Sequence, residues 1–284
     1  MPSSLPATAP LVALSTSSCY PESAAAAFEL AARLGYDGVE VMVMGDPISQ
    51  DASTIARLSR HYRMPVLAVH APTLLISQRV WSPDPARRLQ LAAEMALRLE
   101  AQVLVAHPPF LWQRDYAAGF ADQLDGLADS AGGELRLTVE NMYPWRVGRA
   151  EIPAYLPHWS PLDQPYGHIT LDASHAATAG DDVVDLATRL GPRVAHVHLG
   201  DGSGSARDEH LEPGTGRQPV GALLDHLVDH GYQGIVTVEV STRRAADRPA
   251  RQAVLDRSLR FARSRLAVPF AGRAGHRGAR RRSG

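Results

Sequence analysis

The run Leu135-Arg-Leu-Thr-Val-Glu140 predicts a β-strand that ends in a carboxylate, and three later runs repeat this pattern. They are His168-Ile-Thr-Leu-Asp172, Val194-Ala-His-Val-His198 and Gly234-Ile-Val-Thr-Val-Glu239. Side chains alternate between the two faces of a strand, so each terminal residue shares its face with the residue two positions earlier. Those earlier residues are Thr138, Thr170, His196 and Thr237, and His168 follows on the face of Asp172. The opposite faces are largely aliphatic, which is typical of barrel strands covered by helices on the outside.

Strand-like and helix-like segments alternate along the rest of the chain. Further strands are expected at 11–14, 38–43, 65–70 and 102–107. Helices are expected at 22–34, 51–62, 83–99, 115–130, 181–190, 219–230 and 249–266, and a proline-broken loop at 141–166. Eight strands alternating with helices predict an α/β protein, a (β/α)8 TIM barrel in a single domain. An open doubly wound sheet is the alternative.

The two ends of the chain differ from this pattern. Residues 1–10 contain three prolines and several small residues, and we expect a disordered leader there. Residues 11–267 would form the barrel, with its site at the carboxyl-terminal mouth. Residues 268–284 hold five arginines and no acid, which predicts a basic disordered tail.

Composition narrows the functional classes. The chain has one cysteine, Cys19, so an intramolecular disulfide is impossible and a thiolate metal cluster is disfavoured. All 29 basic residues are arginine, which excludes a lysine Schiff base. No apolar run approaches the roughly 20 residues of a membrane helix, and no signal peptide is evident. We therefore expect a soluble cytoplasmic protein without a membrane partner.

The charge balance bears on the partners. The formal net charge is -1, and the arginines of the terminal segment leave the remainder of the chain acidic. An acidic body argues against a nucleic-acid partner without ruling it out. A small sugar-like molecule is the expected partner, and the sequence leaves open whether the chain forms a homo-oligomer.

Six of the eight predicted strands end in a residue that can hold a divalent metal. These residues are His70, His107, Glu140, Asp172, His198 and Glu239. Closure of a barrel brings all the strand ends to one rim, so the six side chains would converge there. Oxygen and imidazole ligands without a thiolate suit Mn, Mg, Co or Zn. The sequence therefore predicts a divalent metal site at this rim.

Other candidates lie in the loops after the strands. His175 would reach either the metal or a substrate hydroxyl, and Asp208 and His210 could complete a second metal centre with His70 and His107. Arg207 is the predicted contact for an anion or hydroxyl of the substrate.

Further features have a structural or a functional interpretation. Glu40 is a weaker inward candidate, and His196 is expected to fill the barrel and form hydrogen bonds. The glycines of Gly214-Thr-Gly216 permit a tight turn near a ligand. Four tryptophans would either form the floor of a sugar pocket or pack the loops; they are Trp81, Trp112, Trp145 and Trp159.

These motifs resemble the xylose-isomerase-like TIM barrel superfamily, in its sugar phosphate isomerase/epimerase and endonuclease IV-like branches. The most specific are Val139-Glu-Asn141, Leu171-Asp-Ala-Ser-His175, His196-Val-His-Leu-Gly-Asp201, Pro213-Gly-Thr-Gly216 and Val238-Glu-Val240. The epimerase branch implies one divalent ion on Glu140, Asp172, His198 and Glu239, with His175 on the substrate. The endonuclease IV branch implies three zinc ions on a set that this chain offers in full: His70, His107, Glu140, Asp172, His175, His198, Asp208, His210 and Glu239.

The leading hypothesis is a metal-dependent isomerase or epimerase of a sugar or sugar phosphate. Glu140 and Glu239 would face opposite sides of one substrate carbon. One glutamate would remove a proton and the other return it, through a metal-stabilised enediolate. The alternative is an endonuclease IV-like multi-zinc phosphodiesterase that acts on abasic DNA. A third hypothesis is a barrel that binds a metabolite or a metal without turnover.

Overall fold

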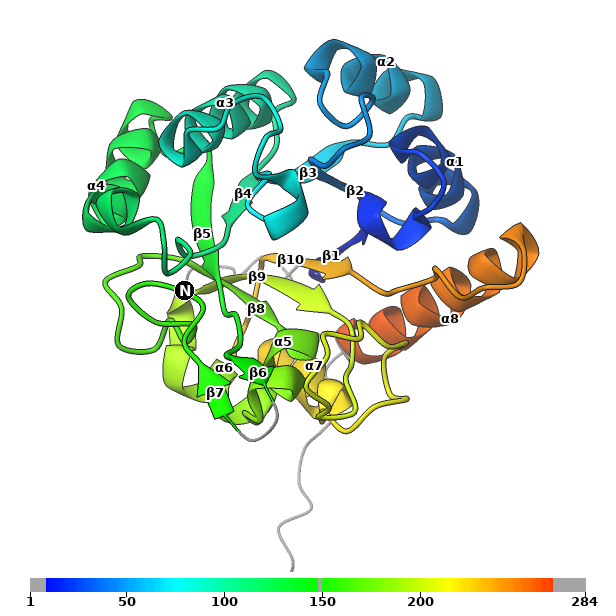
Figure 1. Ribbon diagram of the computed structural model, residues 1–284. Coiled ribbons are helices and arrows are strands. Elements are labelled where there is room, and N and C mark those ends of the chain that lie inside the picture. Colours follow the sequence, from blue (N-terminus) through cyan, green and yellow to red (C-terminus); the bar gives the residue numbers. More distant parts are fainter. Residues whose placement is uncertain (1–8, 148–149, 268–284) are drawn as a thin grey trace, which may run out of the picture.

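The computed structural model describes residues 9–147 and 150–267 (Figure 1). Parallel strands close into a barrel in the order β1-β10-β9-β8-β5-β4-β3-β2, which confirms the predicted single-domain (β/α)8 fold. The strands are β1 Leu11–Ser15, β2 Gly38–Met42, β3 Val66–His70, β4 Val103–Ala106, β5 Arg136–Glu140, β8 Ile169–Asp172, β9 Val194–Leu199 and β10 Ile235–Val238. The predicted tail 268–284, and residues 1–8 of the predicted leader, lie outside the described residues.

Helices surround the barrel on its outside (Figure 1). They are α1 Ala24–Leu34, α2 Ala52–Tyr62, α3 Pro85–Arg98, α4 Arg114–Ser130, α5 Ala173–Ala179, α6 Val183–Leu190, α7 Val220–Asp229 and α8 Arg248–Leu266. Capping fixes several of their ends: the Asp51 carboxylate accepts from the amides of Ser53 and Thr54 at the start of α2. Gly35 ends α1 in the left-handed conformation, with φ 86°. None of the helices in the described ranges is long and apolar enough to cross a membrane.

A β-hairpin and a short α-helix are absent from the sequence prediction. The antiparallel strands β6 Trp145–Val147 and β7 Ala150–Ile152 form a hairpin inside the loop expected at 141–166. Helix α5 starts directly after β8, where the Asp172 carboxylate accepts from the His175 amide. One acidic residue thus ends a strand and caps the following helix, so no turn residue separates the two elements in the sequence.

The barrel interior changes character along its axis. Small and aliphatic side chains form one cluster inside the barrel: Ala13, Leu67, Ala68, Val103, Val105 and Ile235. Above it, the hydroxyls of Thr138 and Thr170 lie 2.6 Å apart, and Glu40 contacts His196. The metal-ligand candidates occupy the carboxyl-terminal ends of the strands. The predicted inward position of His168 is wrong: the side chain is exposed, because β8 starts at Ile169 and its register shifts between Ile169 and Thr170.

The loop after β9 is fixed by one buried carboxylate. Asp201 is fully buried and accepts from the amides of Gly202, Gly214, Gly216 and Gln218. A Cβ added at Gly216 would lie 2.2 Å from Oδ1 of Asp201, so this glycine is needed for the close approach. The predicted glycine turn therefore shapes the loop that carries Asp208 and His210.

We predict that Asp201→Ala destabilises the fold. Loss of the carboxylate leaves four backbone amides without their acceptor, and we expect the free energy of unfolding to fall by about 3 kcal/mol or more. Urea denaturation measures this change. Asp225→Ala is the control, because it breaks only an exposed ion pair with Arg265 and should cost about 0–1 kcal/mol. Equal losses in the two variants would refute the role of Asp201.

Candidate metal and catalytic site

The carboxylate of Glu140 lies at the centre of four imidazoles. Its Oε2 is 3.2 Å from Nε2 of His70 and 3.0 Å from Nε2 of His107. Its Oε1 is 3.1 Å from Nδ1 of His175 and 3.1 Å from Nδ1 of His198. These five residues come from the ends of different strands and from α5, so closure of the barrel brings them together as the sequence pattern predicts.

The four predicted metal ligands meet at one atom, Nδ1 of His198. This nitrogen lies 3.1 Å from Oε1 of Glu140, 3.5 Å from Oδ2 of Asp172 and 3.0 Å from Oε2 of Glu239. Ligand atoms of Glu140, Asp172 and His198 all lie within 4.8 Å of one another. These three residues are close enough to share an ion, and Glu239 joins them through its contact with His198.

The chemistry of this group fits a divalent cation. Three carboxylates around one imidazole nitrogen repel its lone pair unless positive charge lies between them. Oδ2 of Asp172 is buried and has no hydrogen-bond partner within the described chain. Burial acts to lower the pKa of His198, but the surrounding carboxylates raise it well above the usual value. A proton or a metal ion at Nδ1 satisfies all of these groups. Carboxylate oxygens together with one imidazole suit a hard or borderline divalent ion.

A second group lies beside the first. Oδ2 of Asp208 is 3.3 Å from Nε2 of His175 and 2.9 Å from Nε2 of His210. The Asp208 carboxylate also accepts from the Ser174 hydroxyl at 2.8 Å. Ligand atoms of Asp172, His175 and His210 lie within 4.8 Å of one another. The loop residues Asp208 and His210 thus reach the rim, but the predicted pairing with His70 and His107 is wrong. They group with Asp172 and His175, because the loop after β9 lies against α5, whereas His70 and His107 group with Glu140.

A third group consists of His70, His107 and Glu140, whose ligand atoms also lie within 4.8 Å of one another. Burial is the main reason that the pKa of His107 is lowered to about 4, so this imidazole is neutral. Neutral imidazole is the form that binds metals. The three groups share Glu140 and Asp172 and form one continuous cluster.

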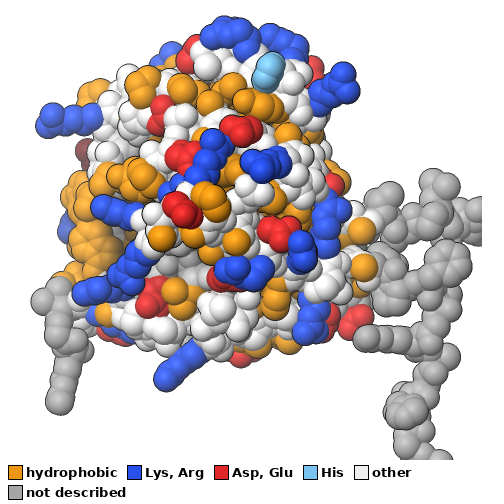
Figure 2. Space-filling view, turned by 90° about the vertical axis from the view of Figure 1, so that its right-hand side faces the viewer, with side chains coloured by type: hydrophobic (Ala, Val, Ile, Leu, Met, Phe, Trp, Pro, Cys, Tyr) orange, Lys and Arg blue, Asp and Glu red, His pale blue; other side chains and the backbone are white. Residues whose placement is uncertain are grey.

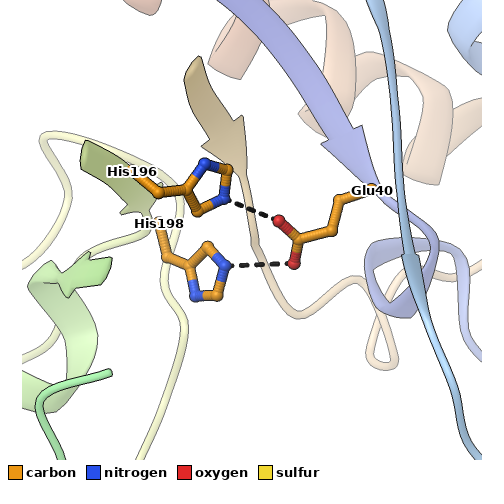
Figure 3. Close-up of side chains that lie close together, drawn as sticks. All are labelled: Glu40, His196 and His198. Carbon is orange, nitrogen blue, oxygen red and sulfur yellow. Dashed lines mark hydrogen bonds and ion pairs between the residues drawn. The ribbon is translucent and has the colours of Figure 1, made fainter. Parts of the chain in front are cut away.

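Glu40 contributes more than the sequence indicated. It is fully buried on β2, and its Oε2 lies 2.7 Å from Nε2 of His196 (Figure 3). Its Oε1 lies 3.0 Å from Nε2 of His198, although this contact is outside regular hydrogen-bond geometry. The expectation that His196 fills the barrel and forms a hydrogen bond is confirmed. Glu40 was only a weaker inward candidate because its strand, Gly38–Met42, is buried at every position and shows no polar face.

The two candidate catalytic glutamates differ in their electrostatic environment. Burial acts to raise the pKa of Glu140, but the charges of His198 and His175 and a hydrogen bond from His107 hold it well below its usual value. Burial raises the pKa of Glu239 above its usual value, and His198 and His210 offset this only in part. Glu140 therefore keeps its negative charge more firmly, and Glu239 accepts a proton more readily.

A cavity of about 540 Å³ opens above the cluster. Its polar floor includes His70, His107, Glu140, His175, Asp208, His210 and Glu239, and its rim includes Ser17, Tyr20, Met44, Ile76 and Arg243. Asp172 and His198 are absent from the lining and lie behind the glutamates. Another cavity of about 500 Å³, beside Arg136, His168 and Tyr232, contains none of the predicted site residues.

Several predicted contacts lie elsewhere. The side chain of Arg207 is exposed and is not part of the cavity lining, whereas Arg243 is. The tryptophans also stay outside the lining. Trp112 stacks on Phe110 at 4.5 Å, and Trp81 donates to the carbonyl of Gln50, which supports loop packing. Ser17 lies in the short 3-10 helix Thr16–Cys19, and Tyr20 and Arg243 lie in loops. None of these segments has a periodic pattern, so no sequence signal marked the three residues.

The comparisons with known proteins agree with this fold. A protein from Mycobacterium tuberculosis without a characterised function is 48% identical over 274 residues, which covers 90% of this chain and 97% of that protein. Fructoselysine 3-epimerase of Escherichia coli is 25% identical over 236 residues, covering 76% of this chain and 85% of the enzyme. The solved structure of AP endonuclease, family 2, from Brucella melitensis has a TM-score of 0.63 at 22% identity, covering 82% and 94% of the two chains. The model of the xylose isomerase-like TIM barrel family matches residues 28–265, so the chain belongs to this family.

Proposed function

We propose that this protein is a divalent-metal-dependent isomerase or epimerase of a sugar or sugar phosphate. The observation that carries the proposal is the convergence of Glu140, Asp172 and Glu239 on Nδ1 of His198 below an open cavity. The similarity to fructoselysine 3-epimerase supports it. A site of this kind combines ligands for a cation with carboxylates that can move protons.

The four converging residues would hold the cation. When bound, a divalent cation supplies Lewis acidity, which polarises substrate oxygens and stabilises the negative charge that develops on them. Glu140 and Glu239 line the cavity, whereas Asp172 and His198 do not. The glutamates therefore reach the substrate, and the other two residues act from behind.

The glutamates would move the proton. One carboxylate takes the proton from the carbon beside the substrate carbonyl. The electrons of the broken C–H bond form a carbon–carbon double bond, and the π electrons of the carbonyl move onto its oxygen, which gives an enediolate. The other carboxylate returns a proton to the opposite face in an epimerase, or the neighbouring carbon receives it in an isomerase. Oε1 of Glu239 accepts from the Ser17 hydroxyl at 3.0 Å, which orients this carboxylate toward the cavity. His175 also lines the cavity and is the proposed contact for a substrate hydroxyl.

We predict that Glu239→Gln abolishes solvent-deuterium incorporation into the sugar product. The amide cannot take up the proton, and loss of a positioned proton-transfer group costs about 10²- to 10⁴-fold in rate. Mass spectrometry of the sugar after turnover in D2O measures the exchange. Glu134→Gln, at an exposed position before β5, is the control and should exchange normally. Normal exchange in Glu239→Gln would remove this residue from the mechanism.

Elemental analysis of the purified protein tests the metal. We expect one divalent ion per chain, together with loss of activity on chelation and recovery on adding the ion. Asp172→Asn should bind the ion more weakly, because it replaces a buried carboxylate ligand. Asp182→Asn is the matched control, since asparagine also caps α6 in place of an exposed aspartate. A protein that is fully active without any divalent ion would contradict the proposal.

A second candidate is a multi-zinc phosphodiesterase acting on abasic DNA. It is favoured by the two further ligand groups, His70, His107 and Glu140, and Asp172, His175 and His210. Against it, arginines of α8 are paired with acids, for example Arg248 with Glu29 and Arg263 with Asp37. Figure 2 shows basic and acidic side chains interspersed on this face. Three zinc ions per chain would favour this candidate over the isomerase.

Two arginines are candidates for binding an anionic group of the substrate. Arg207 is the residue predicted from the sequence. Arg243 lines the cavity, where its guanidinium lies 5.5 Å from the centre of the Tyr20 ring. We predict that Arg243→Gln raises KM for a phosphorylated ketose about tenfold, with a smaller effect on the unphosphorylated ketose. Steady-state kinetics with D-fructose and D-fructose 6-phosphate measure the difference. Arg244→Gln, the exposed neighbour outside the cavity lining, should leave both values unchanged. Equal effects on the two sugars would assign Arg243 no role in binding an anion.

A further inference from the structure

Glu40 lies one layer below the proposed cation position. It belongs to β2, it is fully buried, and it is absent from the cavity lining. Its oxygens point at the two imidazoles that β9 directs into the barrel, Nε2 of His196 at 2.7 Å and Nε2 of His198 at 3.0 Å (Figure 3). A substrate in the cavity therefore cannot touch Glu40, and any effect of this residue on the site passes through the histidines.

The carboxylate of Glu40 imposes a proton arrangement on both rings. An ionised carboxylate only accepts hydrogen bonds, so Nε2 of His196 donates to Oε2 of Glu40. Nε2 of His198 lies 3.0 Å from the negative Oε1, and this charge favours a proton on that nitrogen. The Thr237 hydroxyl supplies a further donor to Oε2 of Glu40 at 3.2 Å. With its proton on Nε2, a neutral His198 ring has its lone pair on Nδ1. That lone pair faces Glu140, Asp172 and Glu239.

We infer that Glu40 is a positioning residue, which holds His198 in the Nε2–H tautomer and so presents Nδ1 as a metal ligand. Imidazoles that bind metals usually donate their other N–H to a carboxylate or a carbonyl, which fixes the ring and its tautomer. This inference rests on the metal site of the proposed function and is independent of the reaction that the site catalyses. It explains why a full negative charge is buried where no substrate reaches it.

His196 completes the arrangement. Its Nε2 donates to the other oxygen of Glu40, and its buried Nδ1 has no hydrogen-bond partner within the described residues. Each carboxylate oxygen thus faces one N–H group. The N–H of His196 and the hydroxyl of Thr237 both donate to Oε2 of Glu40. These contacts fix the rotation of the carboxylate, so Oε1 stays directed at His198.

Glu40→Gln tests the inference. A side-chain amide has one accepting and one donating end, so it cannot accept from Nε2 of His196 and Nε2 of His198 together. We expect the dissociation constant for Mn²⁺, measured by titration calorimetry on the metal-free protein, to rise about 10- to 100-fold. Thr237→Val is the matched control: it removes a buried contact to the same carboxylate without changing the acceptor of His198, and should change the constant less than threefold.

A spectroscopic readout separates positioning from packing. Long-range ¹H–¹⁵N NMR of the wild-type protein loaded with Zn²⁺ should show the proton of His198 on Nε2, with the peak assigned through a His198→Gln variant. A proton on Nδ1 in the wild type would overturn the inference even if Glu40→Gln fails to fold. Unchanged Mn²⁺ affinity in a folded Glu40→Gln protein would overturn it as well. Neither measurement needs turnover, so an inactive enzyme that binds metal would contradict only the proposed reaction.

Discussion

Burial of negative charge is the constraint on which the structure of this barrel depends. Glu40, Glu140, Asp172 and Glu239 are at most 6% exposed. An ionised carboxylate in a low-dielectric interior is stable only beside positive charge or hydrogen-bond donors. Imidazoles from neighbouring strands supply part of this compensation, and the position at Nδ1 of His198 supplies the rest when a proton or a cation occupies it. The cluster therefore acts as one electrostatic unit.

Sequence periodicity predicted the part of this unit that lies on strands. Glu140 and Asp172 end their strands, and His198 and Glu239 lie within one residue of the ends of β9 and β10. A closed parallel barrel brings such ends to one rim. The same alternation gave a wrong position for the residue directly before β8. His168 is exposed because β8 begins after it and changes register. Alternation is therefore reliable along the regular part of a strand and fails at β8, where the register shifts between Ile169 and Thr170.

Other parts of the site depend on contacts between distant segments. Glu40 and His196 are separated by 156 residues, and only closure of the barrel shows that their side chains meet. Arg207 and Arg243 are both loop arginines, so composition could not decide which one lines the cavity. The composition of the loop that carries Asp208 predicted a flexible segment. Its actual path follows from the hydrogen bonds of Asp201, which no local pattern reveals.

Shared ligands also govern how many ions this rim can hold. Glu140 belongs to two of the ligand groups, since one of its oxygens faces His70 and His107 and the other faces His175 and His198. A cation at His198 neutralises part of the negative charge of Glu140. Less of this charge then remains to stabilise a second cation beside His107. A neutral His107 does not repel a second cation. The number of further ions that can bind therefore depends on the remaining carboxylate charge rather than on the number of ligands. The same ligand set can thus support a single-metal proton-transfer site or a multi-metal phosphoryl site, and the loops above it decide which substrate reaches the metal.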